Sequence, residues 1–166
     1  MTALLLWTCA GLVALGSGAL WWFATRTTDD RRLSQIVLVS YLLRVTLGLA
    51  LFAISYWGWP IFKSLQLEDR GFWIFALDGR AYHNLGITIA QAWATGTELP
   101  RLETAIEFFA VVAGVYRVLG AQPLFPILLN AWLAAANGVL AYAIGRRLGG
   151  PRVALLGALF VSFWPS

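Results

Sequence analysis

Long, nearly uncharged apolar runs are the feature that most constrains this chain. They cover residues 3–25, 36–62, 105–119, 124–144 and 153–166. A helix needs roughly 20 mostly apolar residues to cross the hydrocarbon core of a bilayer. The runs lack the alternation of apolar and polar residues that the strands of a membrane barrel require. The sequence therefore predicts an all-α, polytopic membrane helical bundle of about five hydrophobic helices, within a single membrane domain covering residues 1–166.

The composition agrees with a multi-pass protein of the cell (plasma) membrane. Hydrophobic residues make up 60% and charged residues 12% of the 166 positions, which is far from the balance of a soluble domain. The twelve basic residues are scattered among loops and helix ends, so the formal charge of +4 does not indicate binding to nucleic acid. Cys9 is the single cysteine, which excludes a disulfide within one chain.

Short basic loops indicate how the chain is oriented. Residues 26–32 contain three arginines between the first two apolar runs, and the positive-inside tendency places this loop in the cytoplasm. The second run then leaves on the outer side, and residues 63–104 form an outer loop. If every run crosses once, the basic segment 146–152 falls on the outer side, against the same tendency. Either the run 105–119 is re-entrant, or the earlier helices fix the topology.

Among the polar residues inside the apolar runs, Arg44, Asn130 and Asn137 are the candidates for a specific role. Arg44 lies inside the second run, and a charge at mid-bilayer is costly unless it is paired or reaches the interface. We expect the spanning part to begin near Val45, with Arg44 as an anchor at the cytoplasmic boundary. Asn130 and Asn137 lie seven residues apart in the fourth run, beside the small residue Gly138. That combination is typical of helix packing with hydrogen bonds between helices.

The polar stretch of residues 71–100 stands between these apolar runs. It opens with an aromatic and aliphatic patch, residues 72–77, which suits the headgroup interface. The apolar residues that follow recur at helical spacing, namely Tyr82, Leu85, Ile89 and Trp93. The pattern predicts an amphipathic helix over residues 79–95 that lies along the membrane surface without crossing it.

Asp78 immediately precedes this predicted helix and has two interpretations. One is a helix N-cap, in which the carboxylate accepts backbone hydrogen bonds. The other is a carboxylate at the outer membrane surface that accepts a proton from an acceptor hydroxyl or helps to hold a divalent cation. Tyr82 shares the helix face of Asp78, whereas His83 is turned away. The sequence contains no Gly-rich phosphate loop, paired-His metal helix or nucleophile elbow.

Several short motifs follow one another in an order that resembles a known family. They are Asp78-x-x-x-Tyr82-His83, an amphipathic segment ending in Gly96, Tyr116-Arg117 with Gly120, Leu129-Asn130, Arg146-Arg147-Leu148-Gly149 and Pro165-Ser166. From about Leu42 to Ser166 the chain resembles the N-terminal portion of the polytopic glycosyltransferases of the GT-C type. Within that type it is most similar to the bacterial dolichyl-phosphate-mannose-protein-mannosyltransferase-like family that includes the lipid A aminoarabinose transferases.

The resemblance implies sugar transfer at the outer membrane face, from a polyprenyl-phosphate-linked donor and with inversion at the anomeric centre. It implies that Asp78 is the catalytic acidic residue of the first outer loop, with Arg80, Tyr82 and His83 binding substrate. If a divalent cation takes part as cofactor, Asp78 is the residue that would meet it. Such transferases contain many more helices, so the resemblance also implies that these residues are the N-terminal part of a longer fold and are inactive alone.

Two other functions remain open. The chain could be a non-catalytic membrane scaffold or partner subunit that binds a lipid-linked sugar or another membrane protein. It could instead be a small transporter in which Arg44, Asn130 and Asn137 line a path. Transporters of this kind usually show internal repeats with broken helices in matched positions, and the sequence has no such symmetry. In every case the lipid bilayer is the expected partner.

Overall fold

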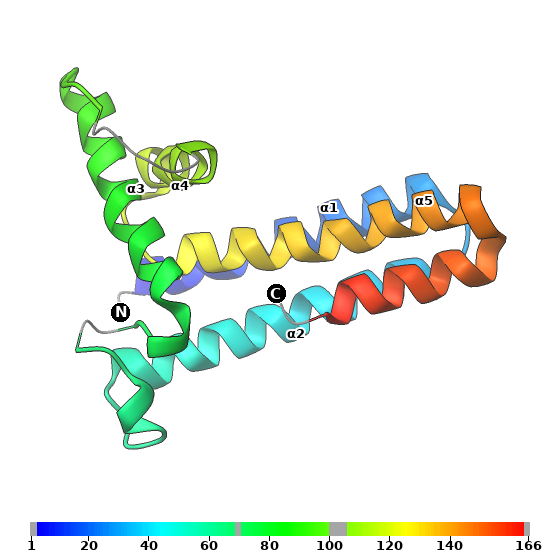
Figure 1. Cartoon of the computed structure of the whole chain (residues 1–166), viewed down its shortest axis with the longest axis horizontal. Helices are drawn as coiled ribbons and strands as arrows, with labels where there is room; N and C mark the ends of the chain where they lie inside the picture. Colours follow the sequence, from blue (N-terminus) through cyan, green and yellow to red (C-terminus); the bar gives the residue numbers. More distant parts are fainter. Residues whose placement is uncertain (1–2, 69–70, 100–105, 165–166) are drawn as a thin grey trace. The chain divides into compact units, whose positions relative to one another are not determined.

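A computed structural model describes residues 3–68, 71–99 and 106–164 and is all-α over these ranges (Figure 1). Its elements are α1 (Ala3–Thr27), α2 (Arg31–Tyr56), the short 3-10 helices η1 (Lys63–Leu65) and η2 (Ile74–Ala76), α3 (Leu77–Thr95), α4 (Ile106–Leu119) and α5 (Leu124–Phe163). The chain divides into two compact units. Unit 1 joins the residues up to Gly48 with those from Ile127 onward, and unit 2 comprises Leu49–Pro126.

Three helices, α1, α2 and α5, are long and apolar enough to cross a membrane, which supports the prediction of a membrane protein. The five predicted runs do not become five such helices. The run 105–119 forms α4, whose 14 residues extend about 21 Å at 1.5 Å per residue. That length is shorter than the roughly 30 Å of a hydrocarbon core. The two last runs are the two limbs of α5.

The limbs of α5 meet at a sharp turn. Gly150 has φ 80° and ψ −174°, a conformation that is essentially restricted to glycine, and Pro151 begins the second limb. Figure 1 shows the chain reversing here, so that the second limb runs back beside the first. Small residues allow this close approach, since a Cβ atom on Gly145 would lie 2.9 Å from the Cα of Ala154. Gly138 lies against the Ser162 hydroxyl in the same way.

The core of unit 1 is formed by apolar side chains from α1, α2 and α5. Among the largest fully buried side chains are Leu20, Leu33, Val37, Tyr41, Val139 and Tyr142. Polar groups inside the bundle bond to backbone oxygens: the Trp132 indole donates to the Gly16 carbonyl at 3.2 Å, and the Ser40 hydroxyl donates to the Ser162 carbonyl at 2.5 Å. These bonds satisfy carbonyl and side-chain groups that would be costly to bury alone.

Helix α2 begins earlier than the apolar run predicts. The Asp30 carboxylate accepts a hydrogen bond from the Arg32 backbone N–H at 3.0 Å, so Asp30 caps the helix and Arg31 is its first residue. The helix ends at Tyr56, before Gly58 with its positive φ of 64°. Arg44 consequently lies well inside α2, about 20 Å from its start. The helix therefore starts well before Val45, whereas the role of Arg44 as an anchor at the cytoplasmic boundary stays a prediction.

Unit 2 holds the polar stretch against the last turns of α2. The Trp73 indole donates to the Leu51 carbonyl at 3.1 Å, and the Ser55 hydroxyl donates to the Phe72 carbonyl at 2.9 Å. The Gly71 N–H in turn donates to the Ser55 hydroxyl at 3.2 Å. These bonds fix the segment that leads through η2 into α3, and so they fix where α3 begins.

Helices α3 and α4 pack against each other inside unit 2. In Figure 1, α4 is seen nearly end-on while α3 runs in the plane of the picture, so the two helices cross steeply. Gly86 marks the closest approach, because a Cβ atom there would lie 2.7 Å from a methyl group of Val112. Ile89, Phe109 and Ala113 form the core of the contact. The helix predicted over residues 79–95 is thus α3, and part of its apolar face is covered by α4.

Candidate functional site

Asp78 is the second residue of α3 and its side chain is exposed. The N-cap of the helix is Ala76, which makes no side-chain capping bond, so the N-cap interpretation of Asp78 is wrong. A carboxylate in the first turn still interacts favourably with the positive end of the helix dipole. No hydrogen bond or ion pair engages the Asp78 carboxylate within the described part of the chain. Its oxygens are therefore accessible to a ligand or a proton donor.

Tyr82 is held by packing against α4. Its ring centroid lies 4.7 Å from that of Phe108 and 5.1 Å from that of Phe109, in edge-to-face and tilted geometries. Such pairs stabilise a helix contact beyond the apolar area that they bury. Although the sequence places Tyr82 on the helix face of Asp78, the tyrosine ring is directed toward α4.

His83 pairs with a residue that the sequence analysis did not connect with it. Its Nδ1 lies 2.7 Å from the Tyr116 hydroxyl, and its ring lies 5.4 Å from that of Phe72. Tyr116 is fully enclosed, whereas His83 is half-buried. The motif Tyr116-Arg117 was the only signal for this residue, because no periodic pattern links positions that are 33 residues apart.

Burial sets the protonation of this pair. It lowers the pKa of His83 below its usual 6.5, and it raises the pKa of Tyr116 above its usual 10. At neutral pH the imidazole and the phenol are therefore both uncharged. Each can act as donor or acceptor in the bond that joins α3 to α4, according to the imidazole tautomer.

The four predicted site residues do not form one cluster. Asp78 is exposed at the start of α3, Arg80 is half-buried, and Tyr82 and His83 contact α4. Over the ranges that the structure covers, no three His, Cys, Asp or Glu side chains are placed to hold a metal ion. Asp78 alone offers one carboxylate, whereas divalent cations take several oxygen ligands, so the described residues do not fit a metal centre.

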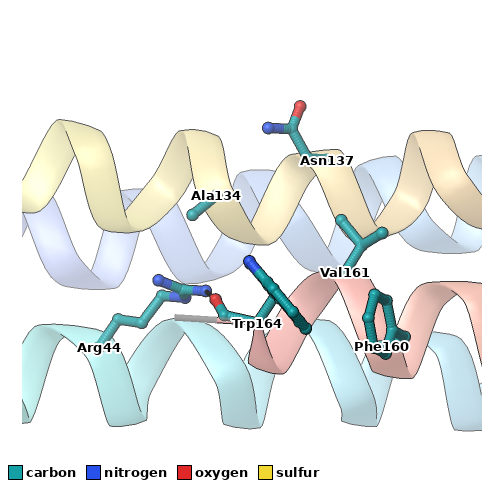
Figure 2. Close-up of a pocket in the computed structure, with 6 residues that line it drawn as sticks. All are labelled: Arg44, Ala134, Asn137, Phe160, Val161 and Trp164. Atoms are coloured by element: carbon teal, nitrogen blue, oxygen red, sulfur yellow. Dashed lines mark hydrogen bonds between the residues drawn. The ribbon is translucent and has the colours of Figure 1, made fainter. Parts of the chain in front are cut away.

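A second polar site surrounds Arg44 in unit 1 (Figure 2). Its guanidinium donates to the carbonyls of Ser162 and Trp164, at 3.2 and 2.6 Å, and so binds the C-terminal end of α5. A groove of about 270 Å³ adjoins it, lined by Arg44, Ala134, Asn137, Phe160, Val161 and Trp164. The last carbonyls of a helix lack partners within the helix, and a cation near them is favourable. Arg44 and the end of α5 therefore satisfy each other inside an apolar bundle.

Of the two asparagines, only Asn137 lines this groove. The Asn137 side chain points away from Arg44 (Figure 2), and both Asn130 and Asn137 are exposed on α5. Neither side chain is hydrogen-bonded within the described ranges, so the predicted bonds between helices are not formed there. The packing role of their small neighbour Gly138 is confirmed by its contact with Ser162.

No protein-family model, no curated protein and no solved structure matches this chain at a significant level.

Proposed function

We propose that these residues form the N-terminal membrane part of a glycosyltransferase, which moves a sugar from a polyprenyl-phosphate-linked donor to an acceptor at the outer membrane face. The observation that supports this best is the exposed carboxylate of Asp78 at the start of α3. The segment before it is hydrogen-bonded to the last turns of α2, through Trp73 and Ser55. The length and apolar composition of α2 support a position of Asp78 near a membrane surface in this proposal.

In this proposal Asp78 acts as the acceptor-side general base. It removes the proton of the acceptor hydroxyl as that oxygen attacks the anomeric carbon of the sugar. The bond from the anomeric carbon to the phosphate oxygen breaks on the opposite side, and polyprenyl phosphate leaves with the electron pair. Attack from the opposite face inverts the anomeric centre. Arg80, Tyr82 and His83 stay candidates for substrate contacts, with Tyr82 and His83 also holding α3 against α4.

The test is sugar transfer from a radiolabelled polyprenyl-phosphate sugar, measured in membranes of cells that produce the protein as the wild type or as Asp78→Asn. The substitution removes the charge at nearly constant volume, so we expect equal insertion and a loss of transfer of roughly 10²- to 10⁴-fold. Glu98→Gln is the matched control, since Glu98 is also an exposed carboxylate of unit 2. It should transfer at the wild-type rate.

Two results would contradict this proposal in different ways. Unchanged transfer by Asp78→Asn would remove the catalytic role of that residue. Transfer that does not exceed the rate in membranes lacking the protein would remove the glycosyltransferase function itself.

The second candidate, a membrane scaffold or partner subunit, is favoured by the exposed amides of Asn130 and Asn137. Polar side chains are expensive against lipid and are usually satisfied by neighbouring helices. On this reading the asparagine face of α5 packs against another membrane helix. Asn130→Ala/Asn137→Ala should then abolish co-purification of a membrane partner, whereas Leu15→Ala, which shortens an exposed apolar side chain on another helix, α1, should retain it.

A further inference from the structure

Two arginine-bearing segments that are far apart in the sequence meet at one end of unit 1. The Arg146 guanidinium donates to the Thr28 hydroxyl at 2.8 Å and to the Tyr142 hydroxyl at 3.2 Å. The Thr28 and Tyr142 hydroxyls also lie 3.2 Å apart. The loop between α1 and α2 therefore lies beside the turn of α5, as Figure 1 shows.

This arginine end carries a concentrated positive charge. Its six arginines are all exposed: Arg26, Arg31, Arg32, Arg146, Arg147 and Arg152. Its acidic residues are Asp29 and Asp30, so four positive charges remain in excess. The Asp30 carboxylate is engaged in capping α2, where it accepts the Arg32 N–H. The six guanidinium groups are therefore exposed at this end, and Arg146 also bonds to Thr28 and Tyr142.

A hollow of about 470 Å³ opens between these segments. It is lined by Thr25, Arg26, Thr27, Thr28, Asp29, Asp30, Tyr142, Arg146 and Pro151. Hydroxyl and guanidinium groups predominate in it, and a guanidinium presents paired N–H donors that match the oxygens of a phosphate. Arg26 and Arg146 supply such donors in the hollow, beside the carboxylates of Asp29 and Asp30.

Exposed aromatic and apolar side chains near the hollow are of the kind that collects at the depth of lipid headgroups. The Arg26 guanidinium lies 5.5 Å from the centre of the Trp22 ring, and Trp21 and Trp22 are both exposed. Tryptophan collects at the boundary between headgroups and acyl chains. Leu148 and Val153, close to the turn of α5 in the sequence, are exposed as well, at 82% and 49%. An acyl chain would contact these side chains while its phosphate contacts the arginines.

We propose that the arginine end binds the phosphodiester headgroups of anionic phospholipids in the membrane leaflet that it faces. Basic groups close to an anionic leaflet are attracted by its negative surface potential. The contact between the two basic segments also bears on the topology. If every apolar run crossed once, the basic segment 146–152 would lie on the outer side, against the positive-inside tendency. With α4 too short to cross, both segments lie on one membrane surface, as the positive-inside tendency requires.

The test is a titration of the purified protein in a non-ionic detergent with dioleoylphosphatidylglycerol, dioleoylphosphatidylcholine or inorganic phosphate, with the bound fraction read by native mass spectrometry. We expect phosphatidylglycerol to bind more tightly than phosphatidylcholine. Each arginine near a lipid surface contributes roughly a fivefold factor in affinity. The double variant Arg26→Gln/Arg146→Gln should therefore raise the phosphatidylglycerol dissociation constant roughly 25-fold and leave phosphatidylcholine binding unchanged.

Two further double variants serve as controls, one at the arginine end and one in unit 2. Arg147→Gln/Arg152→Gln removes two charges from the same end without breaking a bond to Thr28 or Tyr142, and it should also weaken phosphatidylglycerol binding. Lys63→Gln/Arg117→Gln removes two exposed charges of unit 2 and should bind as the wild type does. Three results would overturn the proposal. The first is equal binding of the two lipids, and the second is an equal effect of all three double variants. The third is binding of inorganic phosphate without a preference between the lipids.

Discussion

At the scale of residues, the hydrogen bond between His83 and Tyr116 makes the packing of α3 on α4 sensitive to pH. Burial lowers the pKa of His83 in the folded state, so the folded protein binds the proton less tightly than the unfolded chain does. The stabilisation is complete above pH 6.5, the unfolded value, and is lost as the pH falls toward the lower folded pKa. We therefore expect the amides of α3 and α4 to be less protected from hydrogen exchange at pH 5.5 than at pH 7.5, after correction for the intrinsic exchange rate at each pH.

The control for this prediction is simple because His83 is the only histidine in the chain. His83→Asn keeps a polar side chain near Tyr116 but removes the group that titrates. Protection of the α3 and α4 amides, compared between pH 7.5 and 5.5 by hydrogen-exchange mass spectrometry, should then change little with pH. A loss of protection that persists in this variant would show that another group causes it.

Local sequence predicted helix α3 better than it predicted the contacts of the candidate site residues. The helical spacing correctly predicted α3 and the packing of Tyr82 and Ile89 on one face. It missed the cap, because η2 runs directly into α3 and the helix begins before Asp78. It also missed the partner of His83, since the contact with Tyr116 depends on how α4 crosses α3. Such a crossing is fixed by tertiary packing at Gly86 and not by the periodicity of either helix.

At the scale of elements, Gly150 determines the reversal of α5. Its φ of 80° with ψ of −174° lies in a region that residues with a Cβ atom rarely adopt. Gly150→Ala should destabilise unit 1 by about 1–3 kcal/mol. The measurement is the midpoint of thermal unfolding in detergent. Gly157→Ala is the control in the same helix, because a Cβ there would meet only the Ala141 carbonyl at an ordinary 3.8 Å.

Close packing of the two limbs gives an independent prediction. A Cβ atom on Gly145 would lie 2.9 Å from Ala154 Cα and 3.3 Å from Ala154 N, both backbone atoms that cannot rotate away. Gly145→Ala should therefore separate the limbs and lower the unfolding midpoint, by overpacking that typically costs about 1–3 kcal/mol. Gly18→Ala in α1, where a Cβ meets nothing within 4 Å, should be neutral or slightly stabilising. Equal midpoints for the two variants would contradict the close approach.

Hydrophobic length predicted where helices form but not how many cross. The runs 3–25 and 36–62 correspond to α1 and α2 with shifted ends, because capping by Asp30 and the turn at Gly58 determine the bounds of α2. The segment between the last two runs was expected to be a loop. It is instead mostly helical, since Gly150 with Pro151 reverses the chain at a single residue. Hydropathy therefore placed a break between residues 144 and 153 but did not predict that helix continues up to Gly150.

At the scale of the whole molecule, the arginine contacts predict which loops share a membrane surface. In a Cys9→Ala background, Asp29→Cys and Leu148→Cys should react with a membrane-impermeant maleimide from the same side. Trp59→Cys should react from the other side, because α2, which separates Asp29 from Trp59, is long and apolar enough to cross a membrane. The measurement is labelling of intact cells compared with inverted membrane vesicles. Labelling of positions 29 and 148 from opposite sides would contradict the joined arginine end.

The bond between Arg44 and the end of α5 also has a consequence for the order in which the chain is made. The carbonyls of residues 162 and 164 accept hydrogen bonds from Arg44, which is synthesised about 120 residues earlier. Because a ribosome delivers α2 first, the guanidinium is already in the bilayer when the second limb of α5 arrives. A circular permutant that begins with α5 would reverse this order. In that permutant the last carbonyls of α5 would enter the bilayer before any donor is present. Arg44 would follow with α2, the helix that completes the bundle.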